Sequence, residues 1–502
     1  MSTVISQSPT PQSVGSGRQK AVDWTKSGPK RLLIGGQWVN AHSGKTFATI
    51  DPSTEQELVT VAEADAADVE DAVRAARRAF ETGPWPGMSP HARGRALLKI
   101  AEAMEQHAAE LAAIESHDVG MPLSRSTGSV AVAVETFRYY AGWPSKIFGN
   151  TLPTDPGIFM YTLREPLGVC GLIPAWNFPL VMAAAKIANA LACGNTVVLK
   201  PAELAPLSSL RLGELIEQTE LPPGVVNIVP GFGITAGAAL ANHPGVDKIS
   251  FTGSTAVGKQ ILQASSGNLK KVTLELGGKS PNIIFPDADL DKAVEAAVRT
   301  FLSNSGQHCS AGTRVFVHES LHDELAQRIA RVAETYNVGS PFAPDTMVGP
   351  LISRKQMERV MDYIDRGRTE GANLQFGGTR VGNVGYFVQP TVFSGVSCEA
   401  TIAREEIFGP VGSIIPFEDE NDAVFKGNDT EYGLAAAVWT KDIARAHKVA
   451  RALKAGRVWI NTYGENDPAM PSGGYKQSGY GREFGAESID AYMQTKAVLV
   501  RF

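Results

Sequence analysis

The stretch VCGLIPAWNFPLVMAAAKIANALACGNTVVLKPAE, residues 169–203, contains two short apolar runs on either side of one helical pattern. Val169–Ile173 and Thr196–Leu199 predict buried strands, and residues 180–191 have the apolar spacing of a helix. A strand, a helix and a strand in this order indicate a βαβ unit with two parallel strands.

The same alternation continues along the chain. Strands are predicted at 225–229, 248–251 and 271–274, separated by helical patterns near 206–218, 234–242 and 255–265. After the Gly277-Gly278 pair, strands at 282–285 and 313–317 flank a helix at 289–302. We expect an α/β fold with a Rossmann-like parallel sheet in a first domain and a second α/β domain beyond these glycines.

Composition excludes several classes of protein. The 502 residues carry a net charge of -5 without a basic stripe, so we expect no nucleic-acid partner. No run approaches the roughly 18 apolar residues of a membrane helix, and no metal is expected. The four cysteines (Cys170, Cys193, Cys309, Cys398) are too sparse for a disulfide scaffold, which favours a reducing compartment. Residues 1–28 are predicted to be a flexible tail, and the protein cytoplasmic.

Reactive side chains follow the predicted strands. Asn177, Lys200, Ser254 and Glu275 each come just after one, and ligands bind beyond the carboxyl ends of parallel strands. Cys309 lies in the polar run SNSGQHCSAGTR, residues 303–314, across the domain boundary from Glu275. A nucleophile, a base and an amide donor are the parts of an acyl-transfer site. If these residues have no catalytic role, Cys309 is a buried cysteine, Glu275 is a solvated glutamate, and Asn177 caps the helix that starts near Phe178.

A second pattern indicates a nucleotide. FTGSTAVG, residues 251–258, follows a strand and opens a helix, whose free N–H groups can face a pyrophosphate. Lys200 and Glu203 can bind ribose hydroxyls, and Glu203 would repel a 2′-phosphate, which favours NAD over NADP. The alternative for both residues is an exposed charge pair.

From about Leu33 to its end, the chain resembles the aldehyde dehydrogenase family. The resemblance rests on PAWNFP (174–179), LELGGK (274–279), the Cys309 run and EEIFGP (405–410). It implies that Cys309 forms a thiohemiacetal and then a thioester with an aldehyde, while Asn177 and a backbone N–H hold the oxyanion and Glu275 activates water. The implied cofactor-binding residues are Ile173, Pro174, Trp176, Lys200, Glu203, Gly253, Ser254, Gly258, Leu276, Glu406 and Phe408.

The resemblance also implies three parts of the fold. An NAD-binding domain would comprise 29–147 and 167–276, and a catalytic domain 277–480. Segments 148–166 and 481–502 would form a small β extension that joins copies into a homotetramer or a homodimer.

The predicted substrate tunnel departs from the large aromatic residues of several family members. Phe178 and Met182 are kept, but Ala185, Ser303 and Ser472 are small. His308 and Glu465 add polar groups to the predicted tunnel. Small side chains predict a wide tunnel for bulky, aromatic or terpenoid aldehydes, unless other residues fill the space.

Three alternatives come from other classes. A coenzyme-A-acylating relative would pass the same thioester to a thiol, although Glu275 favours water. A non-catalytic, NAD-binding structural protein would not need the intact catalytic set. The run His318-Glu-Ser-Leu-His322 matches a zinc-peptidase motif, but 315–317 reads as a strand, so a chance match is expected.

Overall fold

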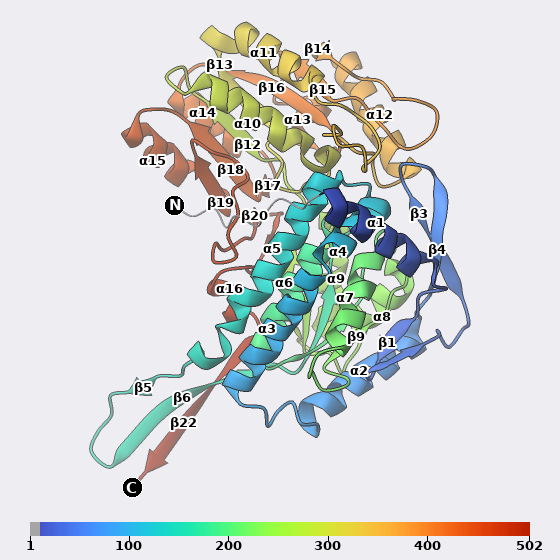
Figure 1. Ribbon diagram of the computed structural model, residues 1–502. Coiled ribbons are helices and arrows are strands. Elements are labelled where there is room, and N and C mark those ends of the chain that lie inside the picture. The colour runs from blue at the N-terminus through green and yellow to red at the C-terminus, as the bar shows by residue number, and fades with distance from the viewer. Residues whose placement is uncertain (1–10) are drawn as a thin grey trace.

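The computed structural model describes residues 11–502, which form two α/β domains and a projecting β extension (Figure 1). The first domain is built on an eight-stranded sheet whose middle strands, from β9 to β11, are parallel. Its order is β2 (Gln37–Val39), β1 (Leu32–Ile34), β9 (Val226–Ile228), β8 (Thr196–Leu199), β7 (Val169–Ile173), β10 (Lys248–Thr252), β11 (Lys271–Glu275) and β21 (Gly479–Tyr480).

Helices cover both faces of this sheet. One face packs against α3 (Pro90–Gln106), α4 (Ala108–Val119), α5 (Leu123–Ala141), α6 (Pro179–Ala192) and α7 (Leu207–Glu217). The other packs against α2 (Ala66–Glu81), α8 (Ala238–Asn242) and α9 (Thr255–Ala264). The chain runs from β7 to β8 on one side and later returns to β10 on the other. The crevice beyond β7 and β10 is therefore a switch point of the topology, where ligands bind in open α/β sheets.

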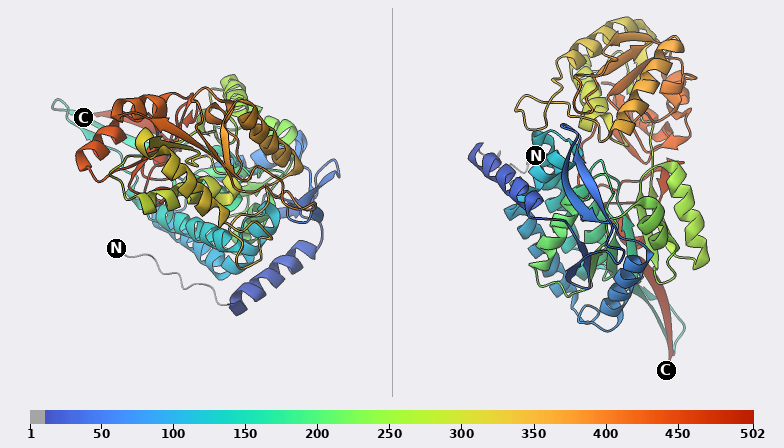
Figure 2. Two further views of the ribbon diagram at one scale, coloured as in Figure 1. Left: turned by 90° about the horizontal axis from the view of Figure 1, so that it is seen from above. Right: turned by 90° about the vertical axis from the view of Figure 1, so that its right-hand side faces the viewer.

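The second domain lies against the first at this carboxyl edge (Figure 2). Its seven-stranded sheet has the order β14 (Asn373–Phe376), β15 (Thr391–Ser394), β16 (Val411–Phe417), β13 (Arg314–His318), β12 (Pro281–Ile284), β18 (Ala435–Trp439) and β19 (Arg457–Ile460). One face packs against α10 (Leu290–Leu302) and α11 (His322–Glu334). The other packs against α12 (Arg354–Thr369), α13 (Thr401–Arg404), α14 (Glu420–Asn428) and α15 (Ile443–Ala452).

The strand predictions are confirmed to within one residue at nearly every end, and the α/β class is confirmed. Strands β7 and β8 have the predicted bounds. They are buried along their whole length, so their sequences are continuous apolar runs. The predicted helix at 234–242 instead begins as a π-helical turn, Gly233–Gly237, before α8.

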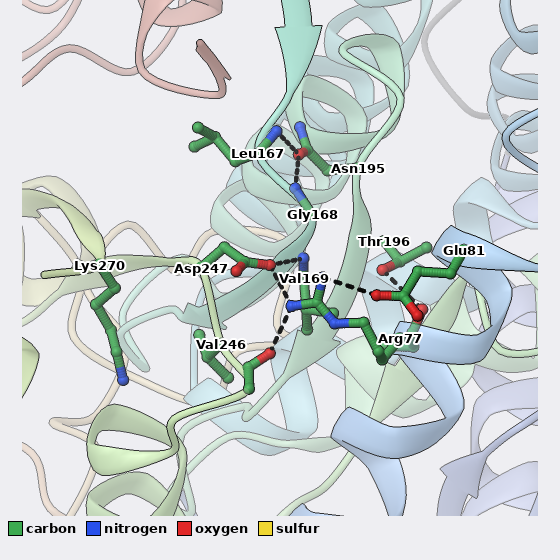
Figure 3. Close-up of polar contacts among 12 residues, drawn as sticks. Arg77, Glu81, Leu167, Gly168, Val169, Asn195, Thr196, Val246, Asp247 and Lys270 are labelled. Carbon is green, nitrogen blue, oxygen red and sulfur yellow. Dashed lines mark hydrogen bonds and ion pairs between the residues drawn. The ribbon is translucent and has the colours of Figure 1, made fainter. Parts of the chain in front are cut away.

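The amino edge of the first sheet is held by a polar network, and its residues are separate from the site residues at the carboxyl edge. Asp247 accepts hydrogen bonds from the Val169 N–H at 2.7 Å and from Arg77, which also donates to the Gly245 carbonyl at 2.9 Å (Figure 3). A Cβ on Gly168 would lie 2.1 Å from the Asp247 carboxylate, at a φ of 133°. This close approach requires glycine, and the network fixes where β7 begins.

The prediction of a flexible tail at residues 1–28 is wrong for residues 11–26. Residues Pro11–Lys26 form α1, which lies along α4 (Figure 1), and the first ten residues are outside the described range. Ala21 is fully buried, and the Trp24 indole donates to Glu214 at 2.7 Å. The composition that predicted a tail did not reveal these two anchoring contacts.

The β extension consists of β22 (Met493–Arg501), β6 (Ile158–Pro166) and β5 (Thr151–Leu152), paired in that order. It projects away from both domains (Figure 1). Short elements complete the fold: the β3 (Thr46–Asp51) and β4 (Gln56–Ala62) hairpin, the β17 (Tyr432–Gly433) and β20 (Tyr475–Lys476) pair, and α16 (Glu487–Asp490). None of the helices between residues 11 and 502 has the length and apolar character needed to cross a bilayer.

Candidate active site

Cys309 follows a sharp turn at the end of α10. Asn304, Ser305 and Gly306 all have left-handed backbone conformations, with φ of 50°, 57° and 75°. A Cβ on Gly306 would lie 1.9 Å from the Gly409 carbonyl oxygen. Two non-glycine residues in this region are strained, so the surrounding contacts must hold the turn in place.

Hydrogen bonds hold the Cys309 loop against both domains. Gln307 accepts from the Ile352 N–H at 2.8 Å, and Ser305 donates to the Gly349 carbonyl at 2.8 Å. Asn177 donates to the Gln307 carbonyl at 3.0 Å and accepts from Asn304 at its own carbonyl at 2.8 Å. These bonds anchor Asn177 on the loop.

Asn177 is not the helix cap. The N-cap position of α6 is Phe178, without a side-chain cap bond, and the Asn177 side chain is 2% exposed. An amide nitrogen carries two protons, and the bond to Gln307 uses one of them. The second N–H is therefore the group that could serve as an oxyanion donor.

Glu275 reaches the same place from the first domain. It is the last residue of β11, and Gly278, three residues further on, lies against the nucleophile loop. A Cβ on Gly278 would lie 2.4 Å from the Cys309 carbonyl oxygen. Gly278 thus allows the strand carrying Glu275 and the loop carrying Cys309 to meet.

The surroundings of Cys309 and Glu275 disfavour the ionised form of each side chain. Burial, together with the negative charges of Glu406 and Glu275, raises the pKa of the Cys309 thiol to about 12. Burial and the charge of Glu483 raise the pKa of Glu275 well above its usual value, opposed by Lys186. Without ligands the thiol is neutral, so its proton must leave before or during attack.

The sequence analysis missed the charges that surround Glu275. Lys186 is buried on α6 and forms an ion pair with Glu483, and the Ser250 hydroxyl bonds to both side chains at 2.9 Å. A lysine within the apolar helix pattern MAAAKIANALA was a usable signal, because a buried lysine needs a partner. Glu483 had no comparable local signal.

The predicted cofactor residues lie along the carboxyl edge of the first sheet. Ile173 ends β7 and is followed by Pro174 and Trp176. Lys200 and Glu203 follow β8, Gly253, Ser254 and Gly258 follow β10, and Leu276 follows β11. Lys200 is buried and pairs with Glu203 at 2.7 Å. Ser254 is the N-cap of α9, and a Cβ on Gly258 would lie 2.6 Å from Leu276. The Thr252 hydroxyl at this edge is buried without a partner among the described residues. The charge pair, the helix start and this hydroxyl suit a dinucleotide.

Two predicted cofactor residues come from the second domain. Phe408 lies 5.2 Å from Trp176, ring centre to ring centre and edge to face, with its backbone at a φ of 61°. Gln356 holds the Phe408 carbonyl at 2.8 Å. Glu406 accepts from the Gly278 N–H at 3.1 Å, and burial raises its pKa to about 7. The two domains therefore meet at these predicted cofactor residues.

The predicted tunnel residues divide into two groups. Phe178 and His308 are in ring contact at 5.1 Å, and Ser303 accepts from Arg125 at 2.7 Å. The others lie elsewhere around the site: Met182 is half-buried and Ala185 buried on α6, Ser472 pairs with Glu483 through the backbone, and Glu465 is exposed. The Glu465 carbonyl accepts from Trp459 at 3.0 Å.

The zinc-peptidase match does not form a helical motif. His318 ends β13 and bonds to Ser320 at 2.8 Å, whereas His322 begins α11 and accepts from the Gly395 N–H at 3.2 Å. The two rings do not project from one helix, as that motif requires.

A Rossmann-like sheet edge that faces a cysteine loop on a second α/β domain defines an oxidoreductase of the dehydrogenase class. The aldehyde dehydrogenase family model matches residues 38–498. A mitochondrial aldehyde dehydrogenase of Arabidopsis thaliana, family 2 member B4, is 52% identical over 93% of this chain and 88% of its own length. Retinal dehydrogenase 2 of Homo sapiens is 49% identical over 94% of this chain and 92% of its own. The NAD+ complex of a Bacillus cereus aldehyde dehydrogenase superposes with a TM-score of 0.95 at 47% identity, covering 96% of this chain and 98% of that one.

The chain belongs to the aldehyde dehydrogenase family, and it is an NAD-dependent enzyme.

Proposed function

We propose that this enzyme oxidises aldehydes to carboxylic acids through Cys309. The observation that carries the proposal is the meeting of three chain segments: Asn177 is bonded to the Cys309 loop, and the Gly278 backbone touches it from the strand that ends in Glu275. An amide donor, a nucleophile and a base are thereby gathered from both sides of the domain boundary.

The chemistry follows from these groups. The Cys309 thiol releases its proton to solvent water and its sulfur attacks the aldehyde carbon, while the free Asn177 N–H donates to the developing alkoxide. When bound, NAD supplies the acceptor for the hydride that leaves this carbon, and a thioester on Cys309 results. Glu275 then takes a proton from water, whose oxygen attacks the thioester carbon. The acid departs and the thiol is restored.

We infer the same roles for the cofactor edge as the family resemblance implies. Domain 29–147 with 167–276 binds NAD, and domain 277–480 carries the nucleophile. Lys200 and Glu203 hold the adenosine ribose, and the Glu203 carboxylate disfavours a 2′-phosphate, so NAD is preferred over NADP. The chain works in the cytoplasm, a setting that suits its four free cysteines.

The preferred aldehydes are bulky or aromatic. Ser303, which Arg125 links to the side of Phe178, has little side-chain volume, and the Phe178 ring offers an apolar face. Ala185 is also small and is buried on α6. The alternative, that other residues fill this space, predicts that phenylacetaldehyde is oxidised less well than acetaldehyde.

The test is NAD reduction by the purified protein across small aliphatic, aromatic and terpenoid aldehydes, with and without coenzyme A. We expect activity that does not depend on coenzyme A and is lost in Cys309→Ala. Glu275→Gln should keep a first-turnover burst of NADH but release acid slowly. Loss of the burst would assign Glu275 to activating the thiol, and dependence on coenzyme A would favour the acylating alternative.

A further inference from the structure

Two arginines that the proposed reaction does not use lie near predicted tunnel residues. Arg125, in the first turn of α5, donates to Ser303 at 2.7 Å, and its guanidinium lies 6.0 Å from the centre of the Phe178 ring. Arg457 begins β19 and bonds to Asn466. They approach the site from different domains.

Both arginines are close enough to the nucleophile loop to act on its charged forms. Their positive charges add to burial in lowering the pKa of His308, next to Cys309, to about 3. Arg457 also acts on Cys309 and Glu275, the two reacting groups. Arg299, on the last turn of α10, is close enough to Arg125 to lower the pKa of its guanidinium. Two positive charges therefore act on His308, and a third lies near Arg125.

Glu275 acts on Arg457 only from a distance, and Arg299 donates to the Tyr463 carbonyl at 3.1 Å. Among residues 11–502, none of the three arginines forms an ion pair, although arginines elsewhere on the chain form many. The Arg457 Nε is buried without a partner. Guanidinium groups that lack a carboxylate partner keep donors free for an anion, and a planar carboxylate matches the guanidinium fork.

Arg125 is placed to meet a ligand. Its side chain is exposed to solvent, while the surrounding protein lowers the pKa of its guanidinium by desolvation. The bond to Ser303 holds the guanidinium beside Phe178 and leaves most of its five N–H donors free.

We propose that the substrate of this enzyme is an aldehyde that carries a carboxylate, which Arg125 binds, with Arg299 and Arg457 supplying further positive charge. The proposal rests on the proposed oxidation at Cys309 and specifies its substrate class. It is compatible with an aromatic substrate, because Phe178 offers a ring face beside Arg125.

The experiment compares matched acids and methyl esters: 4-carboxybenzaldehyde with methyl 4-formylbenzoate, and 4-oxobutanoate with its methyl ester. We expect kcat/KM to favour the acid of at least one pair by about tenfold or more, the effect of one charge-assisted hydrogen bond. Raising the salt concentration should weaken this preference. Arg125→Met should abolish it mainly through KM, and Arg125→Lys should retain part of it.

The control is Arg78→Met, which removes an exposed arginine on α2 and should keep the wild-type ratio of acid to ester. Esters oxidised as well as acids in both pairs would overturn the substrate class but leave the proposed oxidation standing. An acid preference that survives Arg125→Met would overturn the role of Arg125. Binding of 4-carboxybenzaldehyde to Cys309→Ala with NAD, measured by calorimetry, gives a readout independent of turnover: tighter binding than the ester is expected, and equal binding overturns the proposal.

Discussion

The α-carbon of Gly278 lies so close to Cys309 that a Cβ there would be 2.4 Å from the Cys309 carbonyl oxygen. That carbonyl is backbone, so it cannot swing aside as a flexible side chain would. The contact couples the position of the nucleophile to the segment that follows Glu275.

Gly278→Ala should therefore displace the Cys309 loop and lower kcat by about a hundredfold, the effect of an ångström-scale misplacement. Steady-state NADH formation measures the loss, and a thermal unfolding scan shows whether the fold survives. Gly267→Ala is the matched control, because no atom lies within 4 Å of its added Cβ. Equal activity of the two variants would show that the contact does not position the nucleophile.

The Lys186–Glu483 pair sets the pH at which Glu275 can act as a base. Lys186 lowers the Glu275 pKa and Glu483 raises it. Since the base must be ionised, Lys186→Met should move the lower-pH midpoint of kcat to higher pH, and Glu483→Gln should move it to lower pH. Profiles of kcat from pH 5 to 10 measure both. Shifts in the same direction would indicate general damage rather than control of Glu275.

Binding of NAD should depend on the ionisation of Glu406. Burial raises the pKa of this carboxyl to about 7, so it is largely protonated at pH 6 and ionised at pH 8. An ionised carboxylate accepts hydrogen bonds from a ribose better, and the NAD dissociation constant should fall about tenfold across this range. Glu406→Gln should flatten the dependence in a calorimetric titration. Glu405→Gln is the control: Glu405 accepts from the Tyr363 hydroxyl, and this variant should keep the pH dependence of NAD binding.

Much of this fold was predictable from sequence because its central strands are buried on both faces. Strands β7 and β8 contain no polar residue except Thr196, so apolar content alone marked their ends. The Cys309, Glu275 and Asn177 motifs were equally visible. The turn at Asn304 and Ser305 was not, since neither residue type demands a left-handed backbone as strongly as glycine does.

The sequence also did not reveal contacts between residues that lie far apart along the chain. Lys186 and Glu483 are 297 positions apart, and only the fold brings them together. Arg125 gave no motif either, because its proximity to Ser303 depends on how α5 packs against the second domain. The charges that shift the pKa of a reactive group are thus brought near it by the tertiary structure. The reactive group itself can be identified from a local sequence motif.

Glu115 offers a test of buried charge away from the reacting atoms. It is fully buried on α4 and accepts from the Leu180 N–H at 3.0 Å, and burial raises its pKa from 4.5 to about 7. The folded protein therefore prefers the protonated form, and stability falls as pH rises from about 4.5 to about 7. Glu115→Gln keeps an acceptor for Leu180 without the charge. Its free energy of unfolding at pH 8 should exceed that of the wild type by up to about 3 kcal/mol.

The gain from Glu115→Gln should vanish near pH 4.5, which denaturant unfolding at several pH values can measure. Glu102→Gln on the exposed side of α3 should change stability little at any pH. A gain at pH 8 that persists unchanged at low pH would mean that packing, and not ionisation, is responsible.

The β extension should join copies of the chain. β22 is an edge strand, and the extension leaves apolar side chains exposed, among them Phe159 at 41% and Leu499 at 60%. An exposed apolar edge invites pairing with another chain. Leu499→Asp should shift the molar mass measured by light scattering from a dimer or tetramer toward a monomer. Ile443→Asp on α15, 68% exposed but remote from the extension, should not. An unchanged mass in Leu499→Asp would remove the extension from the interface.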